Sequence, residues 1–228
     1  MLSTMNIAAI IPAAGSGSRM SGVKTPKQYL DLGGLTILEM TIKAISSSGL
    51  IDTIYTVLPS SDIEEQEEVL RKKFPKIKEV ITGGTVRAES VRNGVVAANS
   101  DFVLIHDAAR PFISPELIHK VIEAASSSGA ATAALPVSDT LKEFNGNHLG
   151  KPVDREKVLN IQTPQVFKRQ LLLNIYEKIT DFQSGWTDET SMVVQSGNPV
   201  TWVSGDPANI KITTDADLDL SRRILGLF

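Results

Sequence analysis

The sequence predicts an α/β fold in which helices cover both faces of a mixed, mostly parallel sheet. Short apolar runs alternate with segments that carry apolar residues at helical spacing, as in the strand–helix units of parallel sheets. The alternation is interrupted between residues 138 and 158, where a hairpin pattern appears. The 228 residues, 42% of them hydrophobic, are enough for a sizeable core. We therefore expect one doubly wound, Rossmann-like domain over residues 1–228, with a protruding β-arm at about 138–158.

The first part of the chain supplies three strands and two helices. Ile7–Ile11 is an isoleucine-rich run that stops at a proline, which indicates a buried strand. Thr36–Ser47 has apolar residues at helical spacing, and Thr53–Leu58 is a β-branched strand. Asp62–Phe74 is a charged amphipathic helix, and Glu79–Thr82 is a strand closed by two glycines.

The next segments continue the alternation. Arg87–Ala98 is helical, and Phe102–Ile105 is an apolar strand. Pro115–Ser127 is a helix for which Ser114 is a suitable N-cap, and Ala131–Val137 is a fifth strand. Because the strands of such units are parallel, we expect right-handed crossovers between them.

The interruption has the pattern of a β-arm. Leu141–Phe144 and Leu149–Asp154 flank Asn145-Gly146-Asn147, which favours a hairpin. An isolated two-stranded hairpin is only marginally stable, and packing against a partner subunit is one way to cover it. The segments after the arm predict a helix at Lys168–Lys178, a strand at Pro199–Val203 and a helix at Asp215–Leu225 capped by Thr214.

Composition excludes several classes of function. With 23 basic and 26 acidic residues the net charge is −3, which gives no sign of a nucleic-acid partner. The absence of cysteine rules out disulfides, thiolate metal sites and a cysteine nucleophile. No run approaches the roughly 18 apolar residues of a membrane span. We expect a cytoplasmic protein, or a stromal one if the mature chain comes from a plant plastid.

The loop after the first strand is the most informative segment. Small residues occupy most of Pro12–Met20, so main-chain N–H groups can approach an anion closely. In open α/β sheets, ligands bind at the carboxyl ends of strands, which is where this loop lies. Arg19 and Lys27 add two cations, and Lys24 is a candidate third. The loop therefore predicts a phosphate cradle.

Three alternatives compete with this interpretation. A dinucleotide fingerprint needs a third glycine where Met20 stands. A Walker A loop fits less well, because Val23 is one residue too many and Pro26 disfavours a helix starting at Thr25. The third alternative is a plain glycine turn with incidental surface cations.

Further motifs along the chain, together with the loop, resemble one family. The set covers the chain from about Ile7 to Leu225 and is similar to the 2-C-methyl-D-erythritol 4-phosphate cytidylyltransferases of the non-mevalonate isoprenoid pathway, which are nucleotidyltransferases. The motifs are Ala13-Ala14-Gly15-x-Gly17-x-Arg19-Met20, Pro26-Lys27-Gln28-Tyr29, Gly83-Gly84-x-x-Arg87-x-x-Ser90-Val91, His106-Asp107-Ala108-Ala109-Arg110-Pro111, Val153-Asp154-Arg155, Thr163-Pro164-Gln165-x-Phe167, Thr187-Asp188-Glu189 and Asn209-Ile210-Lys211-Ile212-Thr213.

The resemblance implies transfer of a cytidylyl group from CTP to 2-C-methyl-D-erythritol 4-phosphate, with release of pyrophosphate. It implies catalytic roles for Arg19, Lys27, Arg155 and Lys211. It implies that CTP contacts Ala13, Ala14, Gly15, Gly17, Gly83, Gly84, Thr85, Arg87 and Ser90. The acceptor is expected to contact Asp107, Arg110, Thr140 and Thr163, and Asp107 to hold Mg²⁺ or another divalent cation bound with CTP. Thr85 departs from the family pattern, which often has Asp there near the cytosine amino group.

The resemblance also implies a homodimer through the β-arm, with Arg155 reaching the partner's site. No nucleic-acid or membrane partner is expected. Two alternatives remain open: a ribitol 5-phosphate cytidylyltransferase and a non-catalytic nucleotide-sensing module. A glycosyltransferase typically has an Asp-x-Asp motif, whereas the segment at Asp107 has one acid. Asp188-Glu189 fits either a functional motif or the acidic first turn of a helix.

Overall fold

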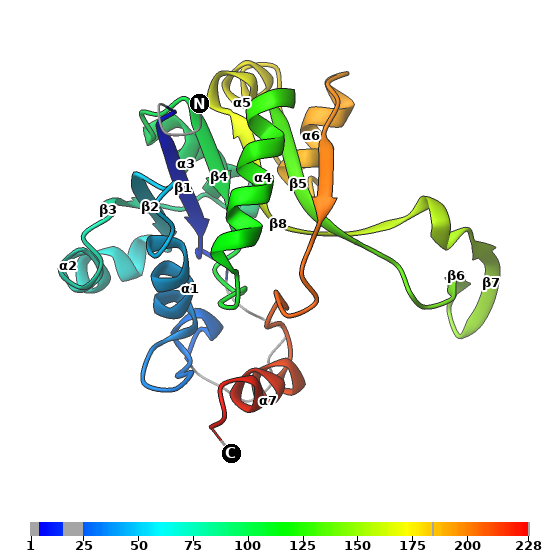
Figure 1. Cartoon of the computed structure of the whole chain (residues 1–228), viewed down its shortest axis with the longest axis horizontal. Coiled ribbons are helices and arrows are strands. Elements are labelled where there is room, and N and C mark those ends of the chain that lie inside the picture. Colours follow the sequence, from blue (N-terminus) through cyan, green and yellow to red (C-terminus); the bar gives the residue numbers. More distant parts are fainter. Residues whose placement is uncertain (1–4, 16–24, 184, 228) are drawn as a thin grey trace.

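A central sheet, flanked by helices, fills the body of the molecule (Figure 1). The structure is a computed structural model, and it describes residues 5–15, 25–183 and 185–227. Seven strands of the described chain pair in the order β3-β2-β1-β4-β8-β5-β9. Their bounds are Ile7–Pro12 (β1), Thr53–Leu58 (β2), Ile77–Thr82 (β3), Phe102–Ile105 (β4), Ala130–Pro136 (β5), Leu159–Lys168 (β8) and Thr201–Ser204 (β9).

The sheet is mixed and mostly parallel, as predicted. β1 pairs in parallel with β2 and β4, β2 with β3, and β5 with β9. Within the described part of the seven-stranded sheet, β8 alone runs antiparallel to its neighbours, β4 and β5. The strands predicted from apolar runs before residue 137 are confirmed, with bounds shifted by two residues or fewer at either end.

The helices form two layers, because alternate residues of the strands face opposite sides of the sheet. Ile7, Ala9 and Ile11 of β1 pack in one core cluster with α1, α2 and α4, whereas Ala8 and Ile10 pack with α3, α5 and α6. The bounds are Ile37–Ser46 (α1), Ile63–Lys73 (α2), Arg87–Ala97 (α3), Pro115–Ser128 (α4), Arg169–Tyr176 (α5), Glu189–Gln195 (α6) and Asp215–Ile224 (α7). Three short 3₁₀ turns lie at Lys27–Tyr29 (η2), Ser60–Asp62 (η3) and Arg155–Lys157 (η4).

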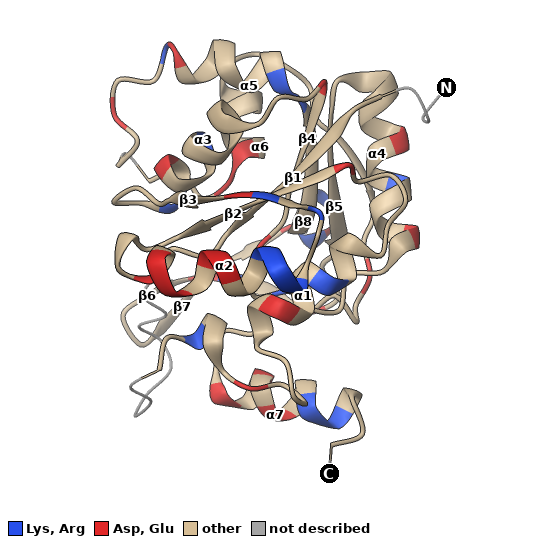
Figure 2. Ribbon diagram, turned by 90° about the vertical axis from the view of Figure 1, so that its left-hand side faces the viewer, with Lys and Arg blue, Asp and Glu red and all other residues tan. Residues whose placement is uncertain are grey.

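Local sequence signals set the helix ends. The Ser114 side chain accepts a hydrogen bond from the Leu117 N–H, and α4 ends at Gly129 with φ 86°. Thr214 forms a capping box with Asp217 at the start of α7. α7 has acidic residues in its first turn and basic ones in its last, as Figure 2 shows, which suits the helix dipole. α7 packs through Leu218 against Leu32 and Ile37, so it closes the domain beside α1.

β8 is the main departure from the predicted elements. From the sequence we expect no strand at Leu159–Lys168, and Pro164 within this segment is unusual inside a sheet. The proline is tolerated because the pairing register with β5 shifts there, from Thr132 opposite Gln165 to Ala134 opposite Ile161. One of the polar residues of β8, Thr163, accepts a hydrogen bond from the main-chain N–H of Asp107, which lines the cavity described below.

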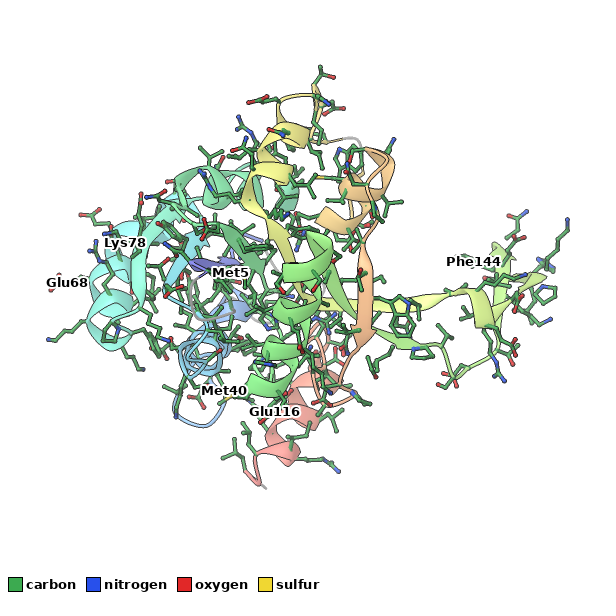
Figure 3. The ribbon with its side chains drawn as sticks, turned by 45° about the horizontal axis from the view of Figure 1, so that its top comes forward. Met5, Met40, Glu68, Lys78, Glu116 and Phe144 are labelled. Carbon is green, nitrogen blue, oxygen red and sulfur yellow. The ribbon has the colours of Figure 1, made fainter. Side chains whose placement is uncertain are left out.

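The predicted β-arm is a hairpin of β6 (Leu141–Asn145) and β7 (His148–Val153). The two strands form a separate sheet and pair with each other. The arm projects far from the sheet, and Phe144 lies on this outlying part (Figures 1 and 3). Phe144 and Leu149 are 79% and 78% exposed. Of the helices that the structure describes, none is both long and apolar enough to cross a membrane.

Candidate active site

A cavity of about 480 Å³ opens at the carboxyl ends of β1, β3 and β4. It is lined by the loop after β1, η2, the start of α3, the loop after β4, and a segment just before α7. The lining residues are Pro12, Ala13, Ala14, Gly15, Lys27, Gln28, Ile37, Gly84, Thr85, Val86, Arg87, Ser90, Asp107, Ala108, Ala109, Lys211 and Thr213. Residues from five of the motifs named above therefore meet in one place.

The loop after β1, which is predicted to form the phosphate cradle, contributes three described residues to the cavity. Ala13, Ala14 and Gly15 line it, as predicted for the cradle, whereas Gly17 and Arg19 lie outside the described residues. Lys27 also lines the cavity, and its Nζ donates a hydrogen bond to the main-chain oxygen of Ile212 (3.3 Å). This bond connects η2 to the segment that carries Lys211.

Close packing explains the two glycines after β3. A Cβ on Gly83 would collide with the Cβ of Ala14, so the loops after β1 and β3 approach each other only because residue 83 is glycine. The Gly84 N–H donates to Ser90 Oγ (3.1 Å), and this hydroxyl in turn donates to the Val86 oxygen (3.1 Å). Gly84 and Ser90 line the cavity, whereas Gly83, which was also predicted to contact CTP, is not among the lining residues.

Thr85, the departure from the family pattern, is held by Glu89. The main-chain N–H and the hydroxyl of Thr85 both donate to Glu89 Oε2, at 2.7 and 2.8 Å. The hydrogen bonds from Thr85 lower the pKa of the Glu89 carboxyl. Because the Thr85 hydroxyl proton points at Glu89, Oγ1 can act toward other groups only as an acceptor, and Gln183 Nε2 donates to it at 3.5 Å.

Asp107 lies at the centre of the charged side of the cavity. Its Oδ2 is 2.7 Å from Lys211 Nζ and 3.9 Å from Arg110 Nε, and its Oδ1 is 3.2 Å from Arg87 Nη2. Burial alone raises the pKa of Asp107, but Arg87, Lys211 and Arg110 outweigh burial and hold the pKa well below its ordinary value. The carboxylate therefore stays ionised at any physiological pH.

Arg87 bridges Asp107 to a second acid, Glu189, which no sequence prediction assigned to the site. Arg87 Nη1 lies 3.1 and 3.0 Å from the two carboxylate oxygens of Glu189, whose side chain is fully buried. Burial raises the pKa of Glu189 above its ordinary value, and the contacts with Arg87 offset only part of this rise. The acidic pair after Thr187 is the only signal in the sequence, and it supported two interpretations. Asp188 is the N-cap of α6, which agrees with the structural interpretation, and Glu189 pairs with Arg87, while a functional role stays a prediction.

A chain of hydrogen bonds connects the loop after β4 to Thr163 of β8. The Asp107 N–H donates to Thr163 Oγ1 (3.1 Å), which lies 3.1 Å from His106 Nδ1, and His106 Nε2 lies 3.0 Å from the Arg110 oxygen. A carbonyl oxygen only accepts, so Nε2 carries the proton and Thr163 donates to Nδ1. Burial lowers the pKa of His106 to about 4, so the ring is neutral.

The predicted acceptor residues fall into three groups. Asp107 and Lys211 line the cavity. Thr163 and Arg110 lie buried behind Asp107, where Arg110 Nη1 donates to the Asn209 oxygen (2.8 Å). Thr140 and Arg155 are exposed residues beside the arm and line no part of this cavity, and Arg155 Nη1 donates to the Ser138 oxygen (2.6 Å). Contacts of all six residues with an acceptor remain predictions.

The donor set suits a cation that arrives with a ligand. Among residues 5–15, 25–183 and 185–227, no three His, Asp or Glu side chains gather into a metal site. Asp107 is the single acid among the described lining residues. Mg²⁺ commonly takes one or two carboxylates together with substrate phosphates and water, so these residues fit Mg²⁺ held jointly with a triphosphate.

Comparison with known proteins agrees with this geometry. The model of the family described as 2-C-methyl-D-erythritol 4-phosphate cytidylyltransferase matches residues 7–226. The protein of that name from Syntrophus aciditrophicus is 39% identical over 224 residues, covering 96% of this chain and 95% of the relative.

Solved structures agree as well. The 4-diphosphocytidyl-2C-methyl-D-erythritol synthase of Anaerococcus prevotii superposes with a TM-score of 0.83 at 32% identity, over 97% of this chain and 99% of that one. The 2-C-methyl-D-erythritol 4-phosphate cytidylyltransferase of Thermus thermophilus does so with a TM-score of 0.80 at 33% identity, over 96% and 98%. The resemblance inferred from the motifs is thereby confirmed, and the chain belongs to the 2-C-methyl-D-erythritol 4-phosphate cytidylyltransferase family.

Proposed function

We propose that the cavity at the carboxyl ends of β1, β3 and β4 transfers the cytidylyl group of CTP to 2-C-methyl-D-erythritol 4-phosphate. The products are 4-diphosphocytidyl-2-C-methyl-D-erythritol and pyrophosphate. One observation carries the proposal: in a chain of this family, Asp107 lies among Arg87, Arg110 and Lys211 in a cavity that Lys27 and a loop of small residues also line. Such a site suits two phosphate-bearing ligands.

The chemistry needs little besides positioning and charge. An oxygen of the acceptor phosphate attacks the α-phosphorus of CTP, and the bond to the β-phosphate oxygen breaks as pyrophosphate leaves. The attacking phosphate is already ionised, so no strong base is required. Lys27 and Arg19 would stabilise the charge that develops on the triphosphate. Lys211, beside Asp107, would orient the acceptor phosphate and offset its repulsion with CTP.

The nucleotide would lie against the walls formed after β1 and β3. Main-chain N–H groups of Ala14 and Gly15 are expected to meet the phosphates. Gly83, Gly84, Ser90 and Thr85 would surround the base. Support for this comes from the close approach of Gly83 to Ala14 and from the hydroxyl of Thr85, whose lone pairs can accept the cytosine amine.

Mg²⁺ would be held by the Asp107 carboxylate and the CTP phosphates. When bound, the ion neutralises phosphate charge and makes the α-phosphorus more electrophilic. The surrounding cations keep Asp107 ionised and fix its orientation for this role. Chelation with EDTA is expected to abolish turnover while circular dichroism stays unchanged, because the described chain builds no metal site of its own.

The arm would complete the acceptor site of a second subunit. Phe144 and Leu149 are exposed on a hairpin that pairs only with itself among the described strands, and two arms packed together would cover each other. Arg155 and Thr140, at the base of the arm, would then reach the partner's cavity. We place this homodimer in the cytoplasm, in keeping with its bacterial relatives.

One assay tests the reaction and its alternatives. The protein is incubated with Mg²⁺, with each of the four nucleoside triphosphates in turn, and with either 2-C-methyl-D-erythritol 4-phosphate or ribitol 5-phosphate, and pyrophosphate is measured. We expect pyrophosphate only with CTP and the methylerythritol acceptor. Turnover with ribitol 5-phosphate alone would identify that compound as the acceptor. Activity only with UTP or GTP would refute the assignment of CTP as the nucleotide. No pyrophosphate release in any pairing would favour a nucleotide-sensing module.

A further inference from the structure

We propose that Glu189 is a positioning residue for this site: it holds the Arg87 guanidinium so that Arg87 fixes Asp107 without drawing its carboxylate away from the cavity. The kinetic part of this inference rests on the proposed function. Glu189 has no exposed side-chain surface and is not among the residues that line the cavity. It acts only through Arg87, which lies between Glu189 and Asp107.

The start of α6 delivers Glu189 to this place. Asp188, the N-cap, accepts hydrogen bonds from the Ser191 N–H (3.0 Å) and from the Thr190 hydroxyl (2.7 Å). Gln165 of β8 donates its Nε2 to the same carboxylate at 2.8 Å. The first turn of α6 is thereby attached to the sheet strand next to β4, and the following residue, Glu189, points inward beneath Arg87.

The protein occupies all three nitrogens of Arg87. Nη1 contacts both oxygens of Glu189, at 3.1 and 3.0 Å, while Nε and Nη2 contact Asp107 Oδ1 at 3.3 and 3.2 Å. A guanidinium has five N–H groups in a fixed plane, so anchoring one end sets the direction of the other. Arg87 is therefore a support for Asp107, and the contact of Arg87 with CTP that the resemblance implies stays a prediction.

Charge balance gives Glu189 a second effect. Three cations, Arg87, Lys211 and Arg110, lie within 4 Å of the single Asp107 carboxylate. Glu189 supplies a second negative charge and takes half of the Arg87 contacts. Without that charge, Arg87 would be paired with Asp107 alone, and Asp107 would attract a further cation less strongly.

A double-mutant cycle tests the proposal, using Glu189→Gln, Arg87→Met and the combined variant. Glutamine keeps the shape of glutamate and removes its charge. We expect Glu189→Gln to lower kcat/KM for CTP by about tenfold or more. Since Glu189 works through Arg87, the combined variant is expected to be no less active than Arg87→Met. Glu177→Gln, the same change at an exposed position on the end of α5, is the matched control and should behave as wild type.

Two readouts separate positioning from a general loss of structure. In thermal unfolding without substrate, Arg87→Met should be less stable than the combined variant, because it leaves a buried carboxylate unpaired. In calorimetric titration with CTP, Glu189→Gln should need a higher Mg²⁺ concentration than wild type for half-maximal CTP affinity. A structural role alone would lower the unfolding temperature and leave that Mg²⁺ midpoint where it is.

Two results would overturn the inference while the wild type remains active. One is a set of kcat/KM losses that multiply in the combined variant, which would mean that Glu189 and Arg87 act independently. The other is a Glu189→Gln variant with wild-type kcat/KM and an unchanged Mg²⁺ midpoint. A wild type that releases no pyrophosphate would refute the proposed function instead, and the unfolding cycle would still show whether the two side chains are coupled.

Discussion

Lys27 lies where its Nζ contacts the Ile212 oxygen (3.3 Å) on the edge of the cavity. If Lys27 stabilises charge that develops during transfer, Lys27→Ala should lower kcat by about 10²–10³-fold with a smaller effect on KM for CTP. Steady-state kinetics measure this, and Lys43→Ala, at an exposed lysine of α1, is the control. A kcat that stays within about threefold of wild type while KM rises would make Lys27 a ground-state binder.

His106 gives the folded state a defined response to acid. Its pKa is lowered by burial to about 4, against 6.5 when unfolded, so between these values the unfolded chain binds more protons and stability falls as pH falls. Between pH 6.5 and 4, this difference in the pKa of His106 lowers the free energy of unfolding by on the order of 3 kcal/mol. Asp107, with a lowered pKa, adds a further loss only below pH 4.

Urea unfolding at several pH values between 7 and 4 measures this response. The free energy of unfolding should fall across the window in wild type and fall less steeply in His106→Gln, which keeps a polar side chain at the buried position. Equal slopes for the two proteins would show that His106 is not the group responsible.

Some residues of the site could be predicted from the sequence, and others could not. Lys27, Asp107 and Lys211 belong to motifs whose residue types suit phosphate chemistry, and all three line the cavity. Glu189 looks like one acid of an exposed first turn, and only its burial and its contact with Arg87 reveal another role. Contacts across 102 residues, as between Arg87 and Glu189, leave no periodic signal in a single sequence.

At the scale of elements, the N-cap residue Asp188 both begins the seven-residue helix α6 and attaches it to β8. Asp188→Ala removes acceptors for Ser191, Thr190 and Gln165, so we expect a loss of about 1–2 kcal/mol in the free energy of unfolding together with a lower kcat, because Glu189 shifts with the helix. Ser114→Ala, which removes the cap of α4, should cost similar stability and leave kcat unchanged. Equal kinetic effects of the two variants would contradict the link between α6 and the site.

Elements with a clear period were predictable, and the strand that organises the site was not. The apolar runs of β1, β2 and β4 and the capped helices α4 and α7 follow local rules. β8 breaks those rules because its polar side chains have partners on other elements: Gln162 reaches Asp206, and Thr163 reaches the Asp107 N–H. A buried polar side chain with partners is indistinguishable in sequence from an exposed one.

At the scale of the whole molecule, the shared acceptor site has a test in mixed dimers. If Arg155 serves the partner's cavity and Lys211 its own, then Arg155→Ala and Lys211→Ala should each be nearly inactive. Refolding the two together gives about half heterodimers by random pairing, each with one intact site of two, so about a quarter of wild-type activity should return. Pyrophosphate release before and after mixing measures the recovery.

Recovery requires that the two residues come from different chains. If both act within one chain, every site stays damaged and mixing restores nothing. A monomer in sedimentation at the assay concentration would also refute the shared site, and the reaction assignment would be unaffected.

The reversed direction of β8 fixes the side of the molecule on which the connection between β5 and β8 emerges. Because β8 runs antiparallel to β4 and β5, it begins at Leu159, paired with Pro136 at the end of β5, on the edge where the cavity opens. Whatever joins the two strands must emerge there, and the hairpin does so without contributing to the sheet. A change in the length of this connection would therefore alter where the arm reaches and leave the order of the strands as it is. Under the proposed function, such a change would affect Arg155, Thr140 and the pairing of subunits before it affected the residues that line the cavity.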